Sequence, residues 1–366
     1  MDVPGTSDHQ SPVAGLRILE FRSPATAFLG RMLVDLGAEV SLVPGRRREQ
    51  GSADVSAYWE VADFGKAVST RPGPGGLSEA DVVLTSDPWA IPGFGAREWS
   101  ELLPKTILVS ITPFGATGPQ AKRPSSDLVN LALGGYLYMT GPEDATPLKP
   151  SVPYVSWRHA ANHALVGLAL ALRNLRLTGR SSHVDVAARD TGLWMLTHTY
   201  QYWEMEGINL RRKGASRDVG RAGVRIPSVY ACRDGTIIWM LLSGQLGKAS
   251  INRLVAWMQS EDAAPSWLID VDWETLHLEA IEDIEAFMKP FADFFLTKTK
   301  VELLERAVQD GFMIAPANTF EDVLADPQLE ARGSWIEREL SDGPRKLPRA
   351  PVRIDSFGWG SRARST

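Results

Sequence analysis

The stretch Leu16–Val43, LRILEFRSPATAFLGRMLVDLGAEVSLV, decides the fold. It opens with a short apolar segment that ends at Phe21, and apolar side chains then recur at helical spacing over Phe28–Leu36. Gly37 is a natural end for that helix, and Glu39–Val43 is a second apolar segment. A strand, a helix and a strand within about thirty residues predict a right-handed βαβ unit, and therefore a parallel sheet covered by helices.

Later segments extend this α/β pattern through the first half of the chain. They predict strands at Asp81–Leu84, Ile107–Thr112 and His183–Ala187, with room for a helix between neighbours. The segment Ala160–Leu175 is apolar on nearly every face. This composition predicts a helix that is buried between the sheet and another layer or subunit.

A second domain is predicted to begin after a Gly- and Arg-rich stretch near Arg212–Arg225. Strands are expected at Ser228–Cys232 and Thr236–Leu242, with a turn between them. A later helix has a clear start, because Thr299 and Glu302 have the spacing of a capping box. We expect that helix to end at Gly311 and to bury a stripe of three side chains, Val301, Leu304 and Val308.

The composition excludes several classes of function. The chain has 366 residues, 44% of them hydrophobic and 23% charged, with a formal net charge of -5, which gives no general attraction to nucleic acids or anionic membranes. Cys232 is the single cysteine, so an intramolecular disulfide and a cysteine metal cluster are both excluded. Met1–Ser11 lacks the apolar run of a signal peptide. We therefore expect a cytoplasmic protein that binds neither nucleic acid nor membrane.

General catalytic motifs are missing from the sequence. It contains neither a Gly-rich phosphate loop that opens a helix nor a Gly-x-Ser-x-Gly elbow. His159 and His163 are four residues apart, but neither an acid nor a cysteine nearby completes a metal site. We therefore expect no bound metal.

Ordered phrases along the chain resemble the family III CoA-transferases, the CaiB/BaiF type that includes formyl-CoA transferase. The similarity runs from about Val13 to Asp355, and its most specific phrase is Val323-Leu-Ala-Asp-Pro-Gln-Leu-Glu-Ala-Arg-Gly-Ser-Trp-Ile. Other phrases are Gly15-Leu-Arg-Ile-Leu-Glu, Leu36-Gly-Ala-Glu-Val, Ser110-Ile-Thr-Pro-Phe-Gly-Ala-Thr-Gly-Pro, Leu177-Thr-Gly-Arg, His183-Val-Asp-Val and Val229-Tyr-Ala-Cys-Arg-Asp-Gly.

The resemblance implies an α/β fold with a Rossmann-like large domain, a smaller α+β domain and two subunits interlocked as a dimer. For this chain we expect a disordered tail at 1–12 and the first part of the large, CoA-binding domain at 13–200. A linker would follow at 201–224 and the small domain at 225–315. A return segment at 316–366 would complete the large domain.

The resemblance also implies a nucleophilic aspartate, which attacks acyl-CoA and forms a mixed anhydride. The matching position in this chain is Trp157, and the sequence has no Asp or Glu between Ala145 and Val184. An indole can form no anhydride. The related racemases use a histidine and an aspartate, and the position of that histidine is Ser126 here. Asp127 matches an acidic family position near the active site. Its alternative role is that of a helix-capping or structural carboxylate.

The residues that match the family's CoA contacts are partly kept. Lys66 matches a basic position suited to the phosphates of CoA, and Arg46 is a looser candidate. Ser86-Asp87-Pro88 departs from the family pattern, and its added carboxylate would repel the phosphates. We expect CoA and acyl-CoA as substrates, with no permanently bound cofactor.

Three functions remain open at this stage. The first is the non-nucleophilic subunit of a heteromeric CoA-transferase, which acts on an acyl-CoA and a carboxylic acid beside an aspartate-bearing homologue. The second is a stand-alone acyl-CoA enzyme with hydrolase or lyase chemistry, in which Asp127 or His159 is the catalytic candidate. The third is an inactive homologue that binds CoA. The sequence identifies neither the acyl group nor the acceptor acid, and leaves homodimer and heterodimer open.

Overall fold

The protein is described from a computed structural model, which covers residues 11, 13–44, 53–69, 74–219, 224–242 and 245–352. The chain forms two compact units. The first unit comprises residues 1–138, 148–210 and 328–366, and the second comprises residues 139–147 and 211–327.

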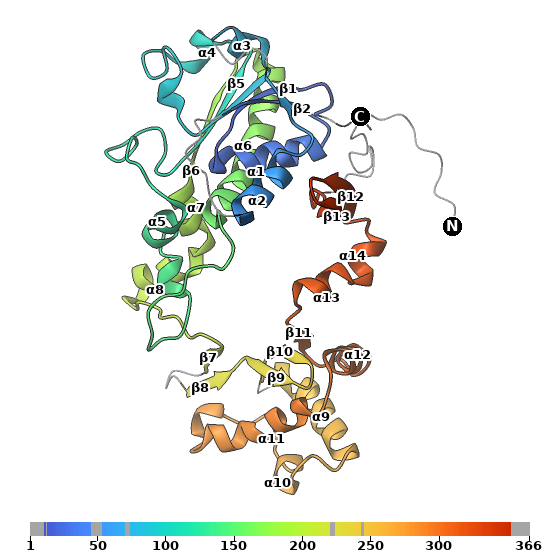
Figure 1. The fold of residues 1–366 in the computed structure, drawn as a ribbon. Coiled ribbons are helices and arrows are strands. Elements are labelled where there is room, and N and C mark those ends of the chain that lie inside the picture. Colours follow the sequence, from blue (N-terminus) through green and yellow to red (C-terminus); the bar gives the residue numbers. More distant parts are fainter. Residues whose placement is uncertain are drawn as a thin grey trace. The chain divides into compact units, whose positions relative to one another are not determined.

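A six-stranded parallel sheet forms the centre of the first unit (Figure 1). Its strand order is β3-β2-β1-β4-β5-β6, the order of a doubly wound Rossmann sheet. The predicted parallel α/β sheet is therefore confirmed. The strands are β1 (Arg17–Phe21), β2 (Glu39–Val43), β3 (Ala67–Val68), β4 (Val82–Thr85), β5 (Ile107–Thr112) and β6 (His183–Ala187).

Helices cover both faces of this sheet. Ile18 and Val82 pack with α1 and α6 on one face, whereas the next residues, Leu19 and Val83, pack on the other with α3 and α4. The helices of the first unit are α1 (Pro24–Asp35), α2 (Ala53–Asp63), α3 (Pro74–Glu79), η1 (Pro88–Ala90), α4 (Trp99–Leu102), α5 (Asp127–Leu133), η2 (Leu137–Met139), α6 (Val155–Thr178), α7 (Ala188–Met195), α8 (Thr197–Glu206) and α14 (Pro327–Ala331).

Helix α1 encloses a buried ion pair. The Lys66 ammonium lies 2.8 Å from a Glu20 carboxylate oxygen, and neither side chain has exposed surface. Gly30 in the middle of α1 makes room for the pair, because a Cβ at this position would lie 1.8 Å from the same Glu20 oxygen. The pair thus needs a glycine in a helix where alanine would otherwise be favoured.

Helix α6 has one buried and one exposed apolar face. Ala160, Ala164 and Leu168 are buried against the sheet, whereas Val166 and Leu170 on the outside are 62% and 64% exposed. The predicted burial of α6 therefore holds for its inner face within this chain. Despite its apolar character, α6 does not qualify as a membrane span, and neither does any other helix of the described residues.

The carboxyl-terminal part of the first unit contains a β-hairpin. Strands β12 (Trp335–Leu340) and β13 (Gly343–Pro348) pair antiparallel. The hairpin turn is fixed to α2, because the Ser341 hydroxyl donates to a Glu60 carboxylate oxygen at 2.8 Å. The hairpin of β12 and β13 therefore belongs to the first unit, although it lies late in the sequence.

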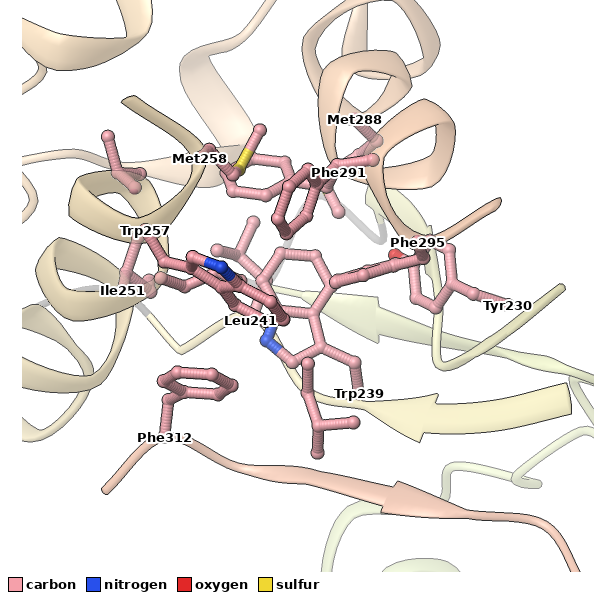
Figure 2. Packing of buried hydrophobic residues seen from close by; sticks show 14 of the residues in the cluster. Tyr230, Trp239, Leu241, Ile251, Trp257, Met258, Met288, Phe291, Phe295 and Phe312 are labelled. Carbon is pink, nitrogen blue, oxygen red and sulfur yellow. The ribbon is translucent and has the colours of Figure 1, made fainter. Parts of the chain in front are cut away.

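The second unit combines small antiparallel sheets with helices. One sheet has the order β11-β10-β9, and β7 and β8 form a hairpin. The core of the second unit is rich in aromatic residues. The Trp239 ring lies 4.7 Å from the Phe291 ring and 5.2 Å from the Phe295 ring (Figure 2). The elements are β7 (Ser216–Val219), β8 (Val224–Pro227), β9 (Val229–Cys232), β10 (Gly235–Trp239), α9 (Gln245–Ser260), α10 (Ser266–Ile269), η3 (Leu278–Ala280), α11 (Ile284–Leu296), α12 (Lys300–Asp310), β11 (Ile314–Pro316) and α13 (Phe320–Leu324).

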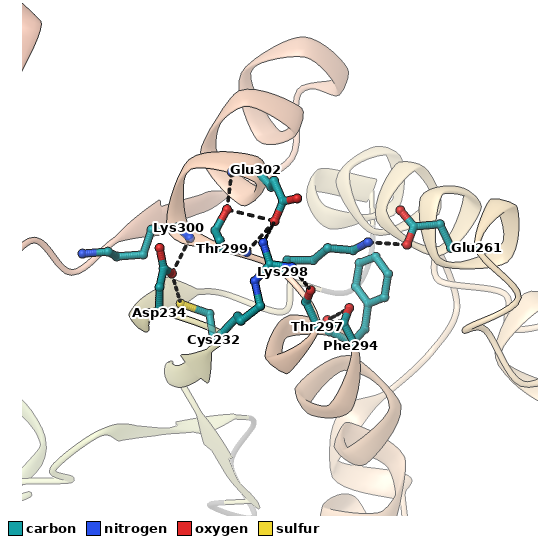
Figure 3. Close-up of polar contacts among 10 residues, drawn as sticks. Cys232, Asp234, Glu261, Phe294, Thr297, Lys298, Thr299, Lys300 and Glu302 are labelled. Carbon is teal, nitrogen blue, oxygen red and sulfur yellow. Dashed lines mark hydrogen bonds and ion pairs between the residues drawn. The ribbon is translucent and has the colours of Figure 1, made fainter.

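Helix α12 confirms the predicted boundaries. Thr299 and Glu302 form the capping box, with the Glu302 carboxylate 2.7 Å from the Thr299 backbone nitrogen (Figure 3). Gly311 ends the helix in the left-handed region, with a φ of 75°.

The predicted buried stripe of α12 is wrong. Val301, Leu304 and Val308 are 61%, 39% and 77% exposed. Leu303 and Ala307 face the core instead. These two residues are four apart, so they also share one helix face, and helical spacing alone does not distinguish the two stripes.

Candidate active site at the amino end of helix α6

The Asp127 carboxylate caps helix α6. It accepts hydrogen bonds from the backbone nitrogens of Val155 at 3.1 Å and Ser156 at 2.8 Å. The Ser156 hydroxyl donates to it at 2.7 Å. Tyr154 at the cap position is left-handed, with a φ of 63°, and supplies no side-chain cap. A carboxylate from a distant helix therefore satisfies the first N–H groups of α6, which supports the helix-capping interpretation of Asp127.

A buried polar network fixes this cap. The Asn130 amide nitrogen donates to the Ser156 hydroxyl at 3.2 Å, and the Ser125 hydroxyl donates to the Asn130 oxygen at 2.6 Å. Asn130 and Ser156 are 1% and 2% exposed. Because each member has a partner, the network holds α5 and the start of α6 in one geometry.

Trp157 is part of the apolar core of the first unit. Its side chain is only 8% exposed and belongs to the cluster that joins the sheet, α1 and α6. Asp127 is the carboxylate that bonds to this end of α6 among the residues described, and its oxygens are engaged by the cap. The site as described therefore presents no carboxylate that is free to attack a thioester.

His159 lies one turn into α6 and is partly exposed. Burial, together with the nearby His163, lowers the pKa of His159, and Asp127 opposes this shift. The imidazole is therefore neutral at physiological pH, as a general base requires. The His163 ring pairs through Nδ1 with the His159 backbone oxygen at 2.9 Å.

Of the two basic residues expected at the CoA phosphates, the structure describes Lys66 but not Arg46. The Lys66 ammonium is buried, paired with Glu20, and donates to the Ala27 oxygen at 3.0 Å. Binding a phosphate would require this ammonium to leave Glu20. Arg46 lies outside the described residues, so its role stays a prediction.

A serine, a histidine and an aspartate meet between β5 and β6, and the motif search missed them. The Ser110 hydroxyl lies 2.7 Å from His183 Nε2, and Asp185 accepts from the Ala116 nitrogen at 2.8 Å. Ser110 has no exposed surface, and its hydroxyl is engaged by His183 and Asp185. The cluster joins two strands and the loop after β5. The alternation His183-Val-Asp185 on one strand was its signal in the sequence.

A pocket of about 610 Å³ lies between α6, β6 and α7. Its walls include Phe114, His163, Asp185, Asp190 and Trp194. Neither Trp157 nor Asp127 is among its lining residues. The cavity is therefore separate from the predicted reaction position.

Arg158, the neighbour of Trp157, was also missed. Its guanidinium carbon lies 5.9 Å from the centres of both the Phe28 and the Tyr58 rings. Arg158 Nε and the Tyr58 hydroxyl are buried, and neither has a hydrogen-bond partner among the described residues. No sequence motif marks this contact, because its members come from α1, α2 and α6.

Two curated relatives cover nearly the whole chain. The succinyl-CoA:(R)-benzylsuccinate CoA-transferase subunit BbsE of Thauera aromatica is 28% identical over 371 residues, covering 94% of this chain and 88% of the relative. The alpha subunit of the succinyl-CoA–L-malate CoA-transferase of Chloroflexus aurantiacus is 23% identical, covering 98% of this chain and 88% of the relative.

A solved structure and a family model agree with these similarities. A CaiB/BaiF family protein from Brucella suis superimposes with a TM-score of 0.77 at 23% identity, covering 96% of this chain and 94% of that protein. The model of CoA-transferase family III matches residues 77–364. Together with the Rossmann strand order, this match shows that the chain belongs to CoA-transferase family III.

Proposed function

We propose that this chain is the non-nucleophilic subunit of a heteromeric CoA-transferase, which moves CoA from an acyl-CoA to a carboxylic acid. Membership of the family establishes the class of substrate, acyl-CoA thioesters. The division of labour between two different chains is the part that we propose.

Trp157 carries the proposal. The resemblance to the family implies that the nucleophile stands at this position, and the Trp157 side chain is buried in an apolar core. The sequence has no Asp or Glu between Ala145 and Val184. The oxygens of Asp127 are committed to the cap of α6, which counts against a replacement by that residue.

In the proposed complex the partner contributes the aspartate. Its carboxylate oxygen bonds to the thioester carbonyl carbon, the carbon–sulfur bond breaks, and CoA leaves as the thiolate. The CoA thiolate then attacks the aspartyl carbonyl of the mixed anhydride, which releases the donor acid as a carboxylate and leaves an aspartyl-CoA thioester. The acceptor carboxylate displaces CoA from this thioester to form a second anhydride, and the thiolate attacks the acceptor carbonyl of that anhydride, which gives the new acyl-CoA and frees the aspartate. This chain contributes binding surface and orientation rather than a covalent bond.

Two observations support a partner chain. The names of the Thauera and Chloroflexus relatives describe them as subunits. In this chain the outer apolar residues of α6, α7 and α8 are unusually exposed, with Leu170 at 64%, Trp194 at 67% and Met205 at 82%. An apolar surface of this kind is typical of a protein interface. We propose that it meets the interlocked partner.

The remaining predictions accompany this proposal. We propose that Lys66 and Arg46 contact the CoA phosphates, with Lys66 exchanging Glu20 for phosphate, and that the complex works in the cytoplasm without a permanently bound cofactor. Binding of CoA to Lys66→Met and Arg46→Gln variants, each compared with wild type, tests these assignments.

The first experiment is purification of the tagged protein from its native cells, with mass spectrometry of the proteins bound to it. We expect a family III homologue that carries the aspartate, in equal amount. The two chains expressed together should transfer CoA from succinyl-CoA, and each chain alone should not.

A pure homodimer would overturn the heteromeric proposal. Hydrolysis of acyl-CoA by that homodimer, lost on replacement of His159, would then establish the stand-alone enzyme. Binding of CoA without turnover would instead identify an inactive homologue.

A further inference from the structure

The pocket between α6, β6 and α7 is lined by negative charge and by no positive charge. Its described lining residues include two carboxylates, Asp185 and Asp190, and neither a lysine nor an arginine. Arg189, outside the lining, pairs with Asp190 at 3.0 Å. Asp185 has no such ion pair with any described residue, so its charge is the one that stays uncompensated in the pocket.

Neutral donors hold the Asp185 carboxylate in place. It accepts hydrogen bonds from the Ala116 backbone nitrogen at 2.8 Å and from the Ser110 hydroxyl at 3.3 Å. Burial lowers the pKa of the neighbouring His183, although Asp185 opposes this shift, so the imidazole is neutral and adds no positive charge. Asp185 is nevertheless exposed. An ordered carboxylate that reaches solvent in a pocket is a preformed acceptor for a cation.

The pocket runs along the open edge of the parallel sheet. β6 is the end strand, and no strand of the described chain pairs with its outer side. Residues 184–187 all line the pocket, although alternate side chains of a strand point to opposite faces, so the pocket lies at the strand edge. The Leu108 nitrogen donates to the Ser182 oxygen, and His183 and Asp185 therefore direct their backbone groups away from β5. Their carbonyl oxygens add acceptors beside the carboxylate.

An exposed indole forms a further wall. Trp194 lines the pocket and is 67% exposed. The face of a tryptophan ring attracts an ammonium or guanidinium group. A carboxylate, outward carbonyl oxygens and an indole together fit a lysine or arginine side chain. The same negative charge would repel the phosphates of CoA and the carboxylate of an acceptor acid, so the pocket does not suit the substrates of the proposed reaction.

Exposed apolar side chains accompany the pocket on both of its helices. Val166 and Leu170 on α6 are 62% and 64% exposed, and Leu193 on α7 is 50% exposed. A small free cation would leave these side chains in water, whereas a protein partner would cover them. Anchoring side chains at protein interfaces insert into pockets surrounded by such contacts, and arginine is common among them.

We propose that a lysine or arginine side chain of the partner chain inserts into this pocket, where Asp185 pairs with its charge and Trp194 packs against its stem. The inference rests on the proposed function for the existence of a partner chain. It adds that this partner carries a basic residue on the surface that meets α6 and α7.

The test is dissociation of the complex in which the protein purifies, followed on dilution by mass photometry at low and at high NaCl. We expect Asp185→Asn to raise the dissociation constant about tenfold or more, because the partner's cation is left without its anion. Asp185→Glu, which keeps the charge, should lie between wild type and Asp185→Asn. Trp194→Ala should also raise the constant about tenfold. The wild-type constant should rise with salt, and that of Asp185→Asn should depend on salt less.

Glu101→Gln is the matched control, because Glu101 is an exposed acid of the first unit outside the pocket lining. It should leave the dissociation constant unchanged. Circular dichroism and the thermal midpoint of each variant report whether the fold is intact. Trp194 is exposed, so Trp194→Ala and the salt dependence of wild type test the pocket even if Asp185→Asn folds poorly.

Three results would overturn the inference. The first is a protein that purifies as a monomer, and the second is a dissociation constant that neither Asp185→Asn nor Trp194→Ala changes. The third is an effect of Trp194→Ala alone with no salt dependence in wild type, which would show an apolar contact without a cation in the pocket. A complex that transfers no CoA but dissociates more readily with both variants would refute the proposed function and leave this inference standing. Transfer by a complex that both variants leave equally tight would do the reverse.

Discussion

The two units of this chain bury different kinds of side chain. Every buried polar residue of the described chain, from Glu20 to Thr191, lies in the first unit. The buried cluster of the second unit consists of apolar and aromatic residues around Trp239 and Phe291.

Buried polar groups contribute little net stability, and each one needs a partner. The second unit therefore resembles a scaffold that is held together by apolar area. In the first unit, some buried polar residues lie beside α1 or at the start of α6, and others lie along β4 and β5 or in α7. The two units therefore differ in the kind of side chain that fills their cores.

The largest expected effect lies in the second unit. Trp239 is 1% exposed and contacts Phe291 and Phe295, so Trp239→Ala should lower the free energy of unfolding by about 4 kcal/mol. Trp267→Ala, at a position that is 45% exposed, is the control and should cost about 1 kcal/mol or less. Urea unfolding followed by circular dichroism measures both. Equal losses would show that the aromatic cluster is not the stabilising core.

The ion pair of the first unit should respond differently. Lys66→Met leaves the Glu20 carboxylate buried without its cation, which should cost about 3 kcal/mol. Adding Glu20→Gln should recover most of this loss. If the double variant is as unstable as Lys66→Met, the loss does not come from an unpaired carboxylate at Glu20.

The pH dependence of Lys66→Met follows from Glu20. Burial raises the folded-state pKa of Glu20 above its unfolded value. The protonated, neutral carboxyl is thus favoured by folding, and stability is highest below the unfolded pKa and falls as the pH rises through the folded one. Unfolding of Lys66→Met measured from pH 4 to pH 8 should show this decline, whereas the double variant should not.

The cap of α6 should give an intermediate effect. Asp127→Asn keeps the shape but weakens the acceptor for Val155 and Ser156, so the free energy of unfolding should fall by about 1–2 kcal/mol. Asp190→Asn, at an aspartate that is 57% exposed, is the control and should change little. A large loss of activity at unchanged stability would instead return Asp127 to the catalytic candidates.

The smallest expected effect is a pH response in the second unit, with the opposite sign to that of Glu20. The Lys300 ammonium and the Thr319 backbone and hydroxyl groups hold the pKa of Asp322 down to about 2. The resulting stabilisation is present above the unfolded pKa and is lost as the pH falls through the folded one. The difference in thermal midpoint between wild type and Asp322→Asn should therefore vanish near pH 2. A difference that persists in acid would exclude this carboxylate as its source.

The sequence predicted the helices, strands and helix ends that depend on the local pattern of residues. The strands of the parallel sheet, the helix that ends before Gly37 and the capping box at Thr299 all follow from spacing and end signals. The buried face of α12 did not follow, because two apolar stripes with helical spacing compete there and tertiary contact selects Leu303 and Ala307. A pattern defines a helix better than it defines the neighbour of that helix.

The contacts of the site depend on long-range packing. Asp127 meets Ser156 across 29 positions, and Arg158 reaches rings from two other helices. No local rule joins these residues. The resemblance to a family implies that Trp157 stands at the nucleophile position, and the folded chain shows that this indole is buried in the core. The fold also shows that Arg158 Nε has no hydrogen-bond partner among the described residues.

Gly30 limits how this protein can be redesigned. Replacing a helical glycine by alanine is a routine way to gain about 1 kcal/mol of stability. At this position the added methyl group would displace the Glu20 carboxylate, and Lys66 would lose its partner. A designed variant with a side chain at position 30 therefore also has to change Glu20 and its partner Lys66, whereas Glu20 and Lys66 can be replaced while Gly30 is kept.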